Sequence, residues 1–215
     1  GNNIDDSRNI RFYIEQSLVD IISKSEINYT FMSKVYKCTL CEKNIGININ
    51  TGDYTKKWSL DNWVNLCNKM LSLGYKLQVF SGISDSEIQE SSKLVEILKQ
   101  NNADNSNKIE FVKYECLAEL MPNLLKLSSL VSVDSGLVHI TSQLKVPVIG
   151  IYTVTSSVLW GGFQDFFYPV QSKHIYNCKN YNYLLGICKN KRELCEGVVS
   201  TNSDIPQIEI IGNLL

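Results

Sequence analysis

Residues 130–162 read LVSVDSGLVHITSQLKVPVIGIYTVTSSVLWGG, and this stretch decides the fold. An apolar, β-branched run ends at the turn Asp134-Ser135-Gly136, an amphipathic segment carrying His139 follows, and residues 146–152 form a second apolar run. This order predicts a strand, a tight turn, a helix and a parallel strand. Because the turn after the first strand of such a unit lies at the carboxyl edge of the sheet, its polar residues stand where open α/β folds bind ligands.

The same alternation of strands and helices extends back to residue 45. The pattern predicts strands at 45–49, 76–81 and 109–113, helices at 59–73, 84–100 and 117–127, and a polar loop at 101–107. Ser59 is a favourable helix N-cap and Gly74 a helix stop, while Ser84 and Glu87 have the spacing of a capping box. Pro122 should kink its helix or lie in its first turn. The chain is therefore predicted to be an α/β protein, a Rossmann-like parallel sheet with helices on both faces.

We expect two parts in the chain. Residues 1–44 are predicted to be a leader with an amphipathic helix at 8–24 and an irregular remainder, and residues 45–215 a Rossmann-like domain with a C-terminal extension. In the extension the sequence predicts an aromatic loop at 160–168, a strand at 173–177 and a last helix from Ser203.

Composition excludes several classes of protein. With 215 residues, 44% of them hydrophobic, the chain can bury a substantial core. The net charge is −1 and the basic residues are scattered, so a general nucleic-acid binder is not expected. No apolar run is long enough to span a membrane, and seven cysteines, an odd number, without an apolar targeting segment favour a reduced, cytoplasmic setting.

The turn at Asp134-Ser135-Gly136 is a candidate anion site. The N-terminus of the following helix presents backbone N–H groups and about half a positive elementary charge, which suits a phosphate or a diphosphate. Gly136 would allow a close approach of the anion, Ser135 could bond an oxygen, and His139 lies one turn further on. The alternative is that Asp134 and Ser135 only cap a core helix while His139 packs at its edge.

The loop after the first strand favours the anion site. Small polar residues and cations follow that strand and should reach the same sheet edge, at Asn50, Thr51, Gly52, Thr55, Lys56 and Lys57. A lysine is a natural counter-charge for a diphosphate, although each of these lysines could instead be a solvated surface residue. Trp58 is expected to pack against a helix rather than to stack on a ligand.

These residues together resemble the lipopolysaccharide heptosyltransferases, which are inverting glycosyltransferases of family nine with two Rossmann-like domains, the GT-B fold. The resemblance extends from residue 45 to the C-terminus. It is carried by four features in this order: Lys56-Lys57-Trp58, the motif Val133-Asp134-Ser135-Gly136-Leu137-Val138-His139, the strand at Pro147, and the loop at 152–162. The sequence departs from the family pattern at Asn50, where glycine is common, and at Thr153-Val154, where Gly-Pro is usual.

The resemblance implies that residues 45–215 are the C-terminal, nucleotide-sugar-binding half of a glycosyltransferase. The donor would be a nucleotide-diphospho-sugar such as ADP-heptose, the acceptor a lipopolysaccharide or another glycan or lipid-linked acceptor, and no cofactor or metal would be needed. The family places its catalytic aspartate in an N-terminal acceptor domain of about 100 to 200 residues, which we expect upstream. We therefore assign no catalytic residue here, and expect a cytoplasmic protein that could work at the inner face of the membrane.

The predicted substrate-binding residues come from three loops. They are Thr51, Gly52, Lys56, Glu87, Asp134, Ser135, Gly136 and His139. Glu87 could accept hydrogen bonds from a ribose, although its place in a capping box already explains it.

Alternatives to the enzyme remain at this point. A non-catalytic nucleotide or nucleotide-sugar binding module of the same fold is the main one. A flavodoxin-like receiver is disfavoured because Asn50, Thr51 and Gly52 stand where such a protein groups acidic residues. A structural zinc site could assemble from cysteines of the leader and the tail, namely Cys38, Cys41, Cys178, Cys188 and Cys195, or these could be buried free thiols.

Overall fold

The computed structural model describes residues 43–162, 164–172, 181–182 and 187–188. Several predictions lie outside these residues: the helix at 8–24 and its irregular continuation, the strand at 173–177, the helix from Ser203, and the side chains of all five cysteines considered for zinc.

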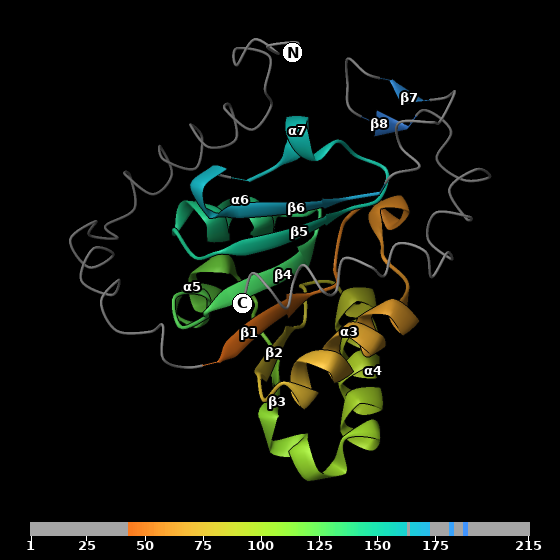
Figure 1. Cartoon of the computed structure of the whole chain (residues 1–215), viewed down its shortest axis with the longest axis vertical. Helices are drawn as coiled ribbons and strands as arrows, with labels where there is room; N and C mark the ends of the chain where they lie inside the picture. The colour runs from red at the N-terminus through yellow and green to blue at the C-terminus, as the bar shows by residue number, and fades with distance from the viewer. Residues whose placement is uncertain (1–42, 163, 173–180, 183–186, 189–215) are drawn as a thin grey trace.

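Six parallel strands form one sheet in the order β3-β2-β1-β4-β5-β6 (Figure 1). They are β1 (Asn44–Asn48), β2 (Lys76–Phe80), β3 (Ile109–Val112), β4 (Ser129–Val133), β5 (Val148–Tyr152) and β6 (Phe167–Gln171). The strands β7 (Tyr181–Asn182) and β8 (Ile187–Cys188) form a separate antiparallel pair. The predicted class, a Rossmann-like parallel sheet, is confirmed.

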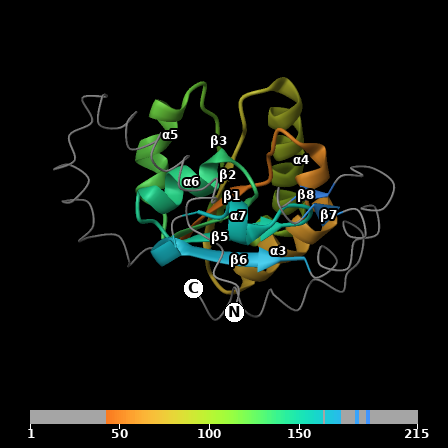
Figure 2. The ribbon, with the colours of Figure 1, turned by 90° about the horizontal axis from the view of Figure 1, so that it is seen from above.

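Helices cover both faces of the sheet, as the two perpendicular views show (Figures 1 and 2). Buried side chains of α3 (Leu60–Ser72) and α4 (Asp85–Asn101) share one core with Ile45 and Ile47 of β1. Those of α5 (Leu117–Leu124) and α6 (Gly136–Gln143) share a second core with Leu130 of β4. Strands β4 and β5 supply apolar side chains to both cores, Val131 and Ile149 to the first and Leu130 and Val148 to the second, which explains the apolar runs at these two strands.

The helix signals read from the sequence have the expected geometry. Ser59 Oγ accepts a hydrogen bond from the Asn62 N–H at 3.3 Å. Gly74 has a φ of 88°, a conformation that glycine adopts at low cost after a helix. Ser84 and Glu87 form both bonds of the predicted capping box.

Three local predictions differ from the structure. Residues 101–107, expected to be a loop, largely belong to the 3-10 helix η3 (Ala103–Lys108). Helix α5 ends at Leu124, earlier than the predicted 127, and Pro122 lies inside it rather than in its first turn. The expected aromatic loop at 160–168 instead holds the end of α7 (Ser157–Trp160), η4 (Gln164–Phe166) and the start of β6. Because β6 is an edge strand with exposed positions and contains Pro169, its sequence lacks the apolar run typical of the inner strands.

Candidate functional site

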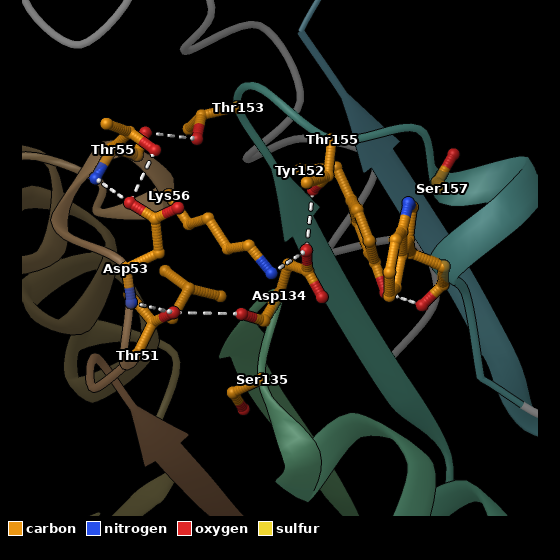
Figure 3. Close-up of polar contacts among 12 residues, drawn as sticks. Thr51, Asp53, Thr55, Lys56, Asp134, Ser135, Tyr152, Thr153, Thr155 and Ser157 are labelled. Atoms are coloured by element: carbon orange, nitrogen blue, oxygen red, sulfur yellow. Dashed lines mark hydrogen bonds and ion pairs between the residues drawn. The ribbon is translucent and has the colours of Figure 1, made fainter. Parts of the chain in front are cut away.

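The strand order creates a switch point between β1 and β4. From these two central strands the chain proceeds to β2 and β3 on one side and to β5 and β6 on the other. At such a point the loops that follow the two strands diverge and leave room for a ligand at the carboxyl edge. Figure 3 shows that the loops after β1, β4 and β5 bring polar side chains together there.

The loop after β1 presents Lys56 from η2 (Tyr54–Lys56), a single 3-10 turn. Asp53 caps this turn: its Oδ1 accepts hydrogen bonds from the N–H and Oγ1 of Thr55 at 3.1 and 2.7 Å. Thr51 Oγ1 donates to the backbone oxygen of Asp134 at 3.2 Å. The loop is thus held by its own cap and by a direct bond to the turn after β4.

Lys56 and Asp134 form an ion pair at the centre of the site. Lys56 Nζ lies 2.9 Å from Asp134 Oδ2, and the exposed fractions of the two side chains are 22% and 4%. The neighbouring Lys57 pairs instead with Glu90 of α4. Lys56 is therefore the lysine of this loop that faces the predicted anion site, and its ammonium is also 5.7 Å from the centre of the Trp160 ring.

The turn after β4 uses Ser135 differently from the capping role considered above. Its side chain makes no cap bond to α6. Instead Ser135 Oγ accepts from Asn48 Nδ2 at 3.0 Å and lies 3.1 Å from Ser132 Oγ. A Cβ built on Gly136 would meet no atom within 4 Å, and the same is true at Gly52. Gly136, the first residue of α6, and Gly52, in the loop after β1, thus both border open space.

Two of the predicted residues lie further from this centre. The side chain of His139 is buried, 5% exposed, one turn into α6. Glu87 Oε2 accepts hydrogen bonds from the N–H groups of Ile83 and Ser84 at 3.2 and 3.0 Å. Contact of either residue with a ligand stays a prediction.

Electrostatics explain the state of two titratable groups near the site. Partial burial raises the pKa of Glu87, but hydrogen bonds from Ser84 and Ile83 and the charge of Lys57 outweigh it, so that the pKa is lowered overall. Burial, reinforced by the negative charge of Asp134, raises the pKa of Tyr152 well above its usual value. The phenol of Tyr152 is therefore neutral and donates to the Trp160 backbone oxygen at 3.0 Å.

The structure also brings in residues that the sequence did not single out as ligand-site residues. Thr155 Oγ1 donates to Asp134 Oδ2 at 2.6 Å, and Thr153 Oγ1 donates to the Thr55 backbone oxygen at 3.2 Å. Asn48, 2% exposed at the end of β1, bonds both Ser132 and Ser135. Asn48 could have been found as a polar residue that interrupts an apolar strand; the threonines carry no signal beyond following a buried strand.

Other predictions concern packing and ions. Trp58 packs edge-on against Trp63 of α3, with ring centres 5.1 Å apart, which confirms its predicted packing role. Among the described residues, no group of three or more His, Cys, Asp and Glu side chains could hold a metal ion. None of the helices in the described part of the chain has the length and apolar character needed to cross a bilayer.

Comparison with known proteins identifies the family. Residues 20–192 match Glycosyltransferase family 9 (heptosyltransferase), and the chain therefore belongs to this family. No curated protein sequence matches the chain.

Three solved structures share the fold. E. coli heptosyltransferase WaaC with ADP has a TM-score of 0.56 and 20% identity, over 67% of this chain and 43% of WaaC. WaaC with ADP-2-deoxy-2-fluoro heptose has a TM-score of 0.52 and 18% identity, over 68% and 42% of the respective chains. The glycosyl transferase family 9 from Veillonella parvula has a TM-score of 0.54 and 19% identity, over 85% and 50%. The chain thus spans half or less of the length of these proteins.

Proposed function

We propose that this chain binds the nucleotide-diphospho-sugar donor of a heptosyltransferase-like enzyme, and that the donor is ADP-heptose or a close relative. The observation that carries the proposal is the Lys56–Asp134 pair beside the open N-terminus of α6, at the switch point of the sheet. The solved relative WaaC holds ADP in one structure and ADP-2-deoxy-2-fluoro heptose in another, which supports an adenine nucleotide as the ligand class.

The proposed chemistry places the diphosphate where positive charge is concentrated. As the bond between the sugar and the diphosphate breaks, negative charge grows on the departing ADP. Lys56 and the N–H groups at the start of α6 would stabilise that charge without a metal ion, since their dipoles and charge are already oriented. Open space at Gly136, the first residue of α6, leaves room for the phosphates beside these groups.

We further propose that the base which activates the acceptor comes from a separate domain. The carboxylate of Asp134 already accepts from Lys56 and Thr155, so it is poorly suited to remove a proton from an acceptor hydroxyl. Exposed apolar side chains follow the carboxyl ends of four strands, at Tyr54 after β1, Ile83 after β2, Leu117 after β3 and Val158 after β5. Exposed apolar residues that follow this edge of the sheet are consistent with a surface that an acceptor-binding domain covers.

Titration calorimetry with ADP tests the donor site. Wild-type protein should bind ADP, and Lys56→Ala should weaken binding at least about tenfold because a charge-assisted bond to phosphate is lost. Lys57→Ala is the matched control, since Lys57 pairs with Glu90, and it should change the affinity less than about threefold. Absence of ADP binding at millimolar concentration, or equal effects of the two lysines, would contradict the proposal.

The alternative is a binding module that keeps the donor site without the transfer reaction. The observation in its favour is Thr153-Val154, which stands where the family usually has Gly-Pro. The full-length protein decides between the two. Release of ADP from an ADP-sugar that depends on a glycan acceptor supports the enzyme, whereas ADP-sugar binding without acceptor-dependent release supports the module.

A further inference from the structure

Gln171, the last residue of β6, holds the loop that follows β5. Its Nε2 donates to the backbone oxygens of Tyr152 and Thr155, both at 3.1 Å. Its Oε1 accepts from the Ser157 N–H at 2.8 Å. An amide side chain has two N–H groups and one carbonyl, and here both kinds of group bond the backbone of one short segment, residues 152–157.

That segment in turn holds the candidate site from the side of β5. The hydroxyl of Thr155 donates to the same carboxylate oxygen, Asp134 Oδ2, that pairs with Lys56. The hydroxyl of Thr153 donates to the backbone oxygen of Thr55, the residue before Lys56. Figure 3 shows both bonds. Thr153 and Thr155 are 5% and 2% exposed, so these bonds are shielded from water and are stronger than they would be at the surface.

Two donors on one carboxylate oxygen fix the carboxylate more firmly than one does. A long lysine side chain can follow a carboxylate that rotates, whereas a buried threonine on a loop with a fixed backbone cannot. The orientation of Asp134, and through it the position of the Lys56 ammonium, therefore depends on the backbone of the segment that Gln171 holds.

We propose that Gln171 and Thr155 are positioning residues for the donor site. Gln171 sets the backbone of residues 152–157, and Thr155 passes this setting to the carboxylate of Asp134 and thereby to Lys56. The ligand part of this inference rests on the proposed function, while its ligand-free part, the dependence of the loop on Gln171, does not.

The Thr155 pair of variants separates hydrogen bonding from packing. Thr155→Val keeps the shape and loses the donor, and it should weaken ADP binding about tenfold. Thr155→Ser keeps the donor and loses a methyl group, and it should stay within about threefold of wild type. A role in packing alone predicts the reverse order, with the serine variant weaker, and that result would overturn the inference.

The Gln171 variants add a readout that needs no ligand. In Gln171→Leu, hydrogen exchange at the Ser157 amide should become at least about tenfold faster, because this amide loses its acceptor, and ADP binding should weaken about tenfold. The matched control is Gln78→Leu. Gln78 lies in β2 and its amide donates to Glu110 of β3, in the half of the strand order away from β5 and β6. Gln78→Leu should leave both readouts unchanged.

The outcomes distinguish the inference from the proposed function. If wild-type protein binds ADP and both Thr155→Val and Gln171→Leu bind it equally well, the inference is overturned and the proposed function stands. If wild-type protein binds no ADP, the proposed function fails, and Ser157 exchange decides the inference: unchanged exchange in Gln171→Leu overturns it. Should Gln171→Leu fail to fold, the two Thr155 variants carry the test.

Discussion

The turn after β4 and the loop after β5 both bond Asp134, but they reach it in different ways. Asp134, Ser135 and Gly136 are consecutive, and a strand and a helix that adjoin them fix their place. Thr155 reaches Asp134 across 21 residues and is itself held by Gln171, 16 residues further on. The turn after β4 is thus formed by consecutive residues of a local motif. The loop after β5 reaches the site only through tertiary contacts.

The glycines of the two regions show the same difference. A Cβ at Gly136 would meet nothing within 4 Å, but one at Gly161 would lie 2.3 Å from the Ser157 backbone oxygen and 2.5 Å from the Phe167 ring. Glycine in the turn after β4 borders open space that a ligand can use, and glycine after α7 permits close packing of the chain on itself.

The largest effect should come from Asp134→Ala, because this change breaks both regions at once. It leaves Lys56 without its carboxylate and Thr155 without its acceptor, and we expect the free energy of unfolding to fall by about 3 kcal/mol, at the lower end of the range for buried pairs because Lys56 is partly exposed. Urea denaturation measures this. The exposed Asp104→Ala should change it by less than about 0.5 kcal/mol, and equal losses in the two variants would refute the central role of Asp134.

The two glycines give the sharpest contrast between the regions. Gly161→Ala should lower the free energy of unfolding by about 2 kcal/mol, because backbone must move to admit the methyl group. Gly136→Ala should change it by less than about 0.5 kcal/mol and still weaken ADP binding, because the methyl group fills space that the ligand needs. Thermal unfolding measures the stability change, and titration calorimetry measures ADP binding. Unimpaired ADP binding by Gly136→Ala would show that the ligand does not occupy the space at Gly136.

Asn48→Ala tests whether the turn after β4 needs the hydrogen bonds from Asn48 to Ser132 and Ser135. The change removes a buried donor to Ser132 and Ser135, and the free energy of unfolding should fall by about 1 to 2 kcal/mol. Asn65→Ala, on the exposed side of α3, is the control and should be neutral or slightly stabilising in urea denaturation. If Asn48→Ala is equally neutral, the turn holds its shape without this support.

The smallest effect is expected at Glu87, where a loop is fixed by its own helix cap. Because folding lowers its pKa, the Glu87 carboxylate adds stability above the ordinary value of 4.5, and this contribution is lost as the pH falls through the lower, folded value. Glu87→Gln should therefore cost less than about 1 kcal/mol near neutral pH, and the difference from wild type should vanish in acid. Urea denaturation between about pH 7 and pH 3.5 measures it. A difference that grows in acid would contradict this sign.

The same contrast decides what could be predicted from the sequence. The inner strands and helices were predictable because burial on two faces leaves apolar runs and because Ser59, Gly74 and Ser84 mark helix ends by local chemistry. The edge strand β6 was not predictable from the sequence, because it is partly exposed and carries Pro169. That it pairs with β5 is seen only in the structure.

The candidate site divides along the same line. Lys56 and Asp134 were predicted as members of one site because both follow inner strands, and the structure pairs them. The bond from Thr155 to Asp134, and the bond from Gln171 to the backbone of Thr155, were not predictable. Both depend on the packing of the loop after β5 against the edge strand β6. Ser135 was assigned two possible roles, and its bond to Asn48 is a third that only packing reveals.

The strand order has a further consequence for how the protein folds. The bond between Asn48 and Ser132 joins positions 84 residues apart, and that between Thr153 and Thr55 joins positions 98 apart. Contacts between such distant parts of a chain form late, because the loss of chain entropy precedes the gain from pairing. A nucleotide held between these loops would therefore bind only the completed fold. Its binding would stabilise the whole fold, and the free energy of unfolding would rise with the nucleotide concentration.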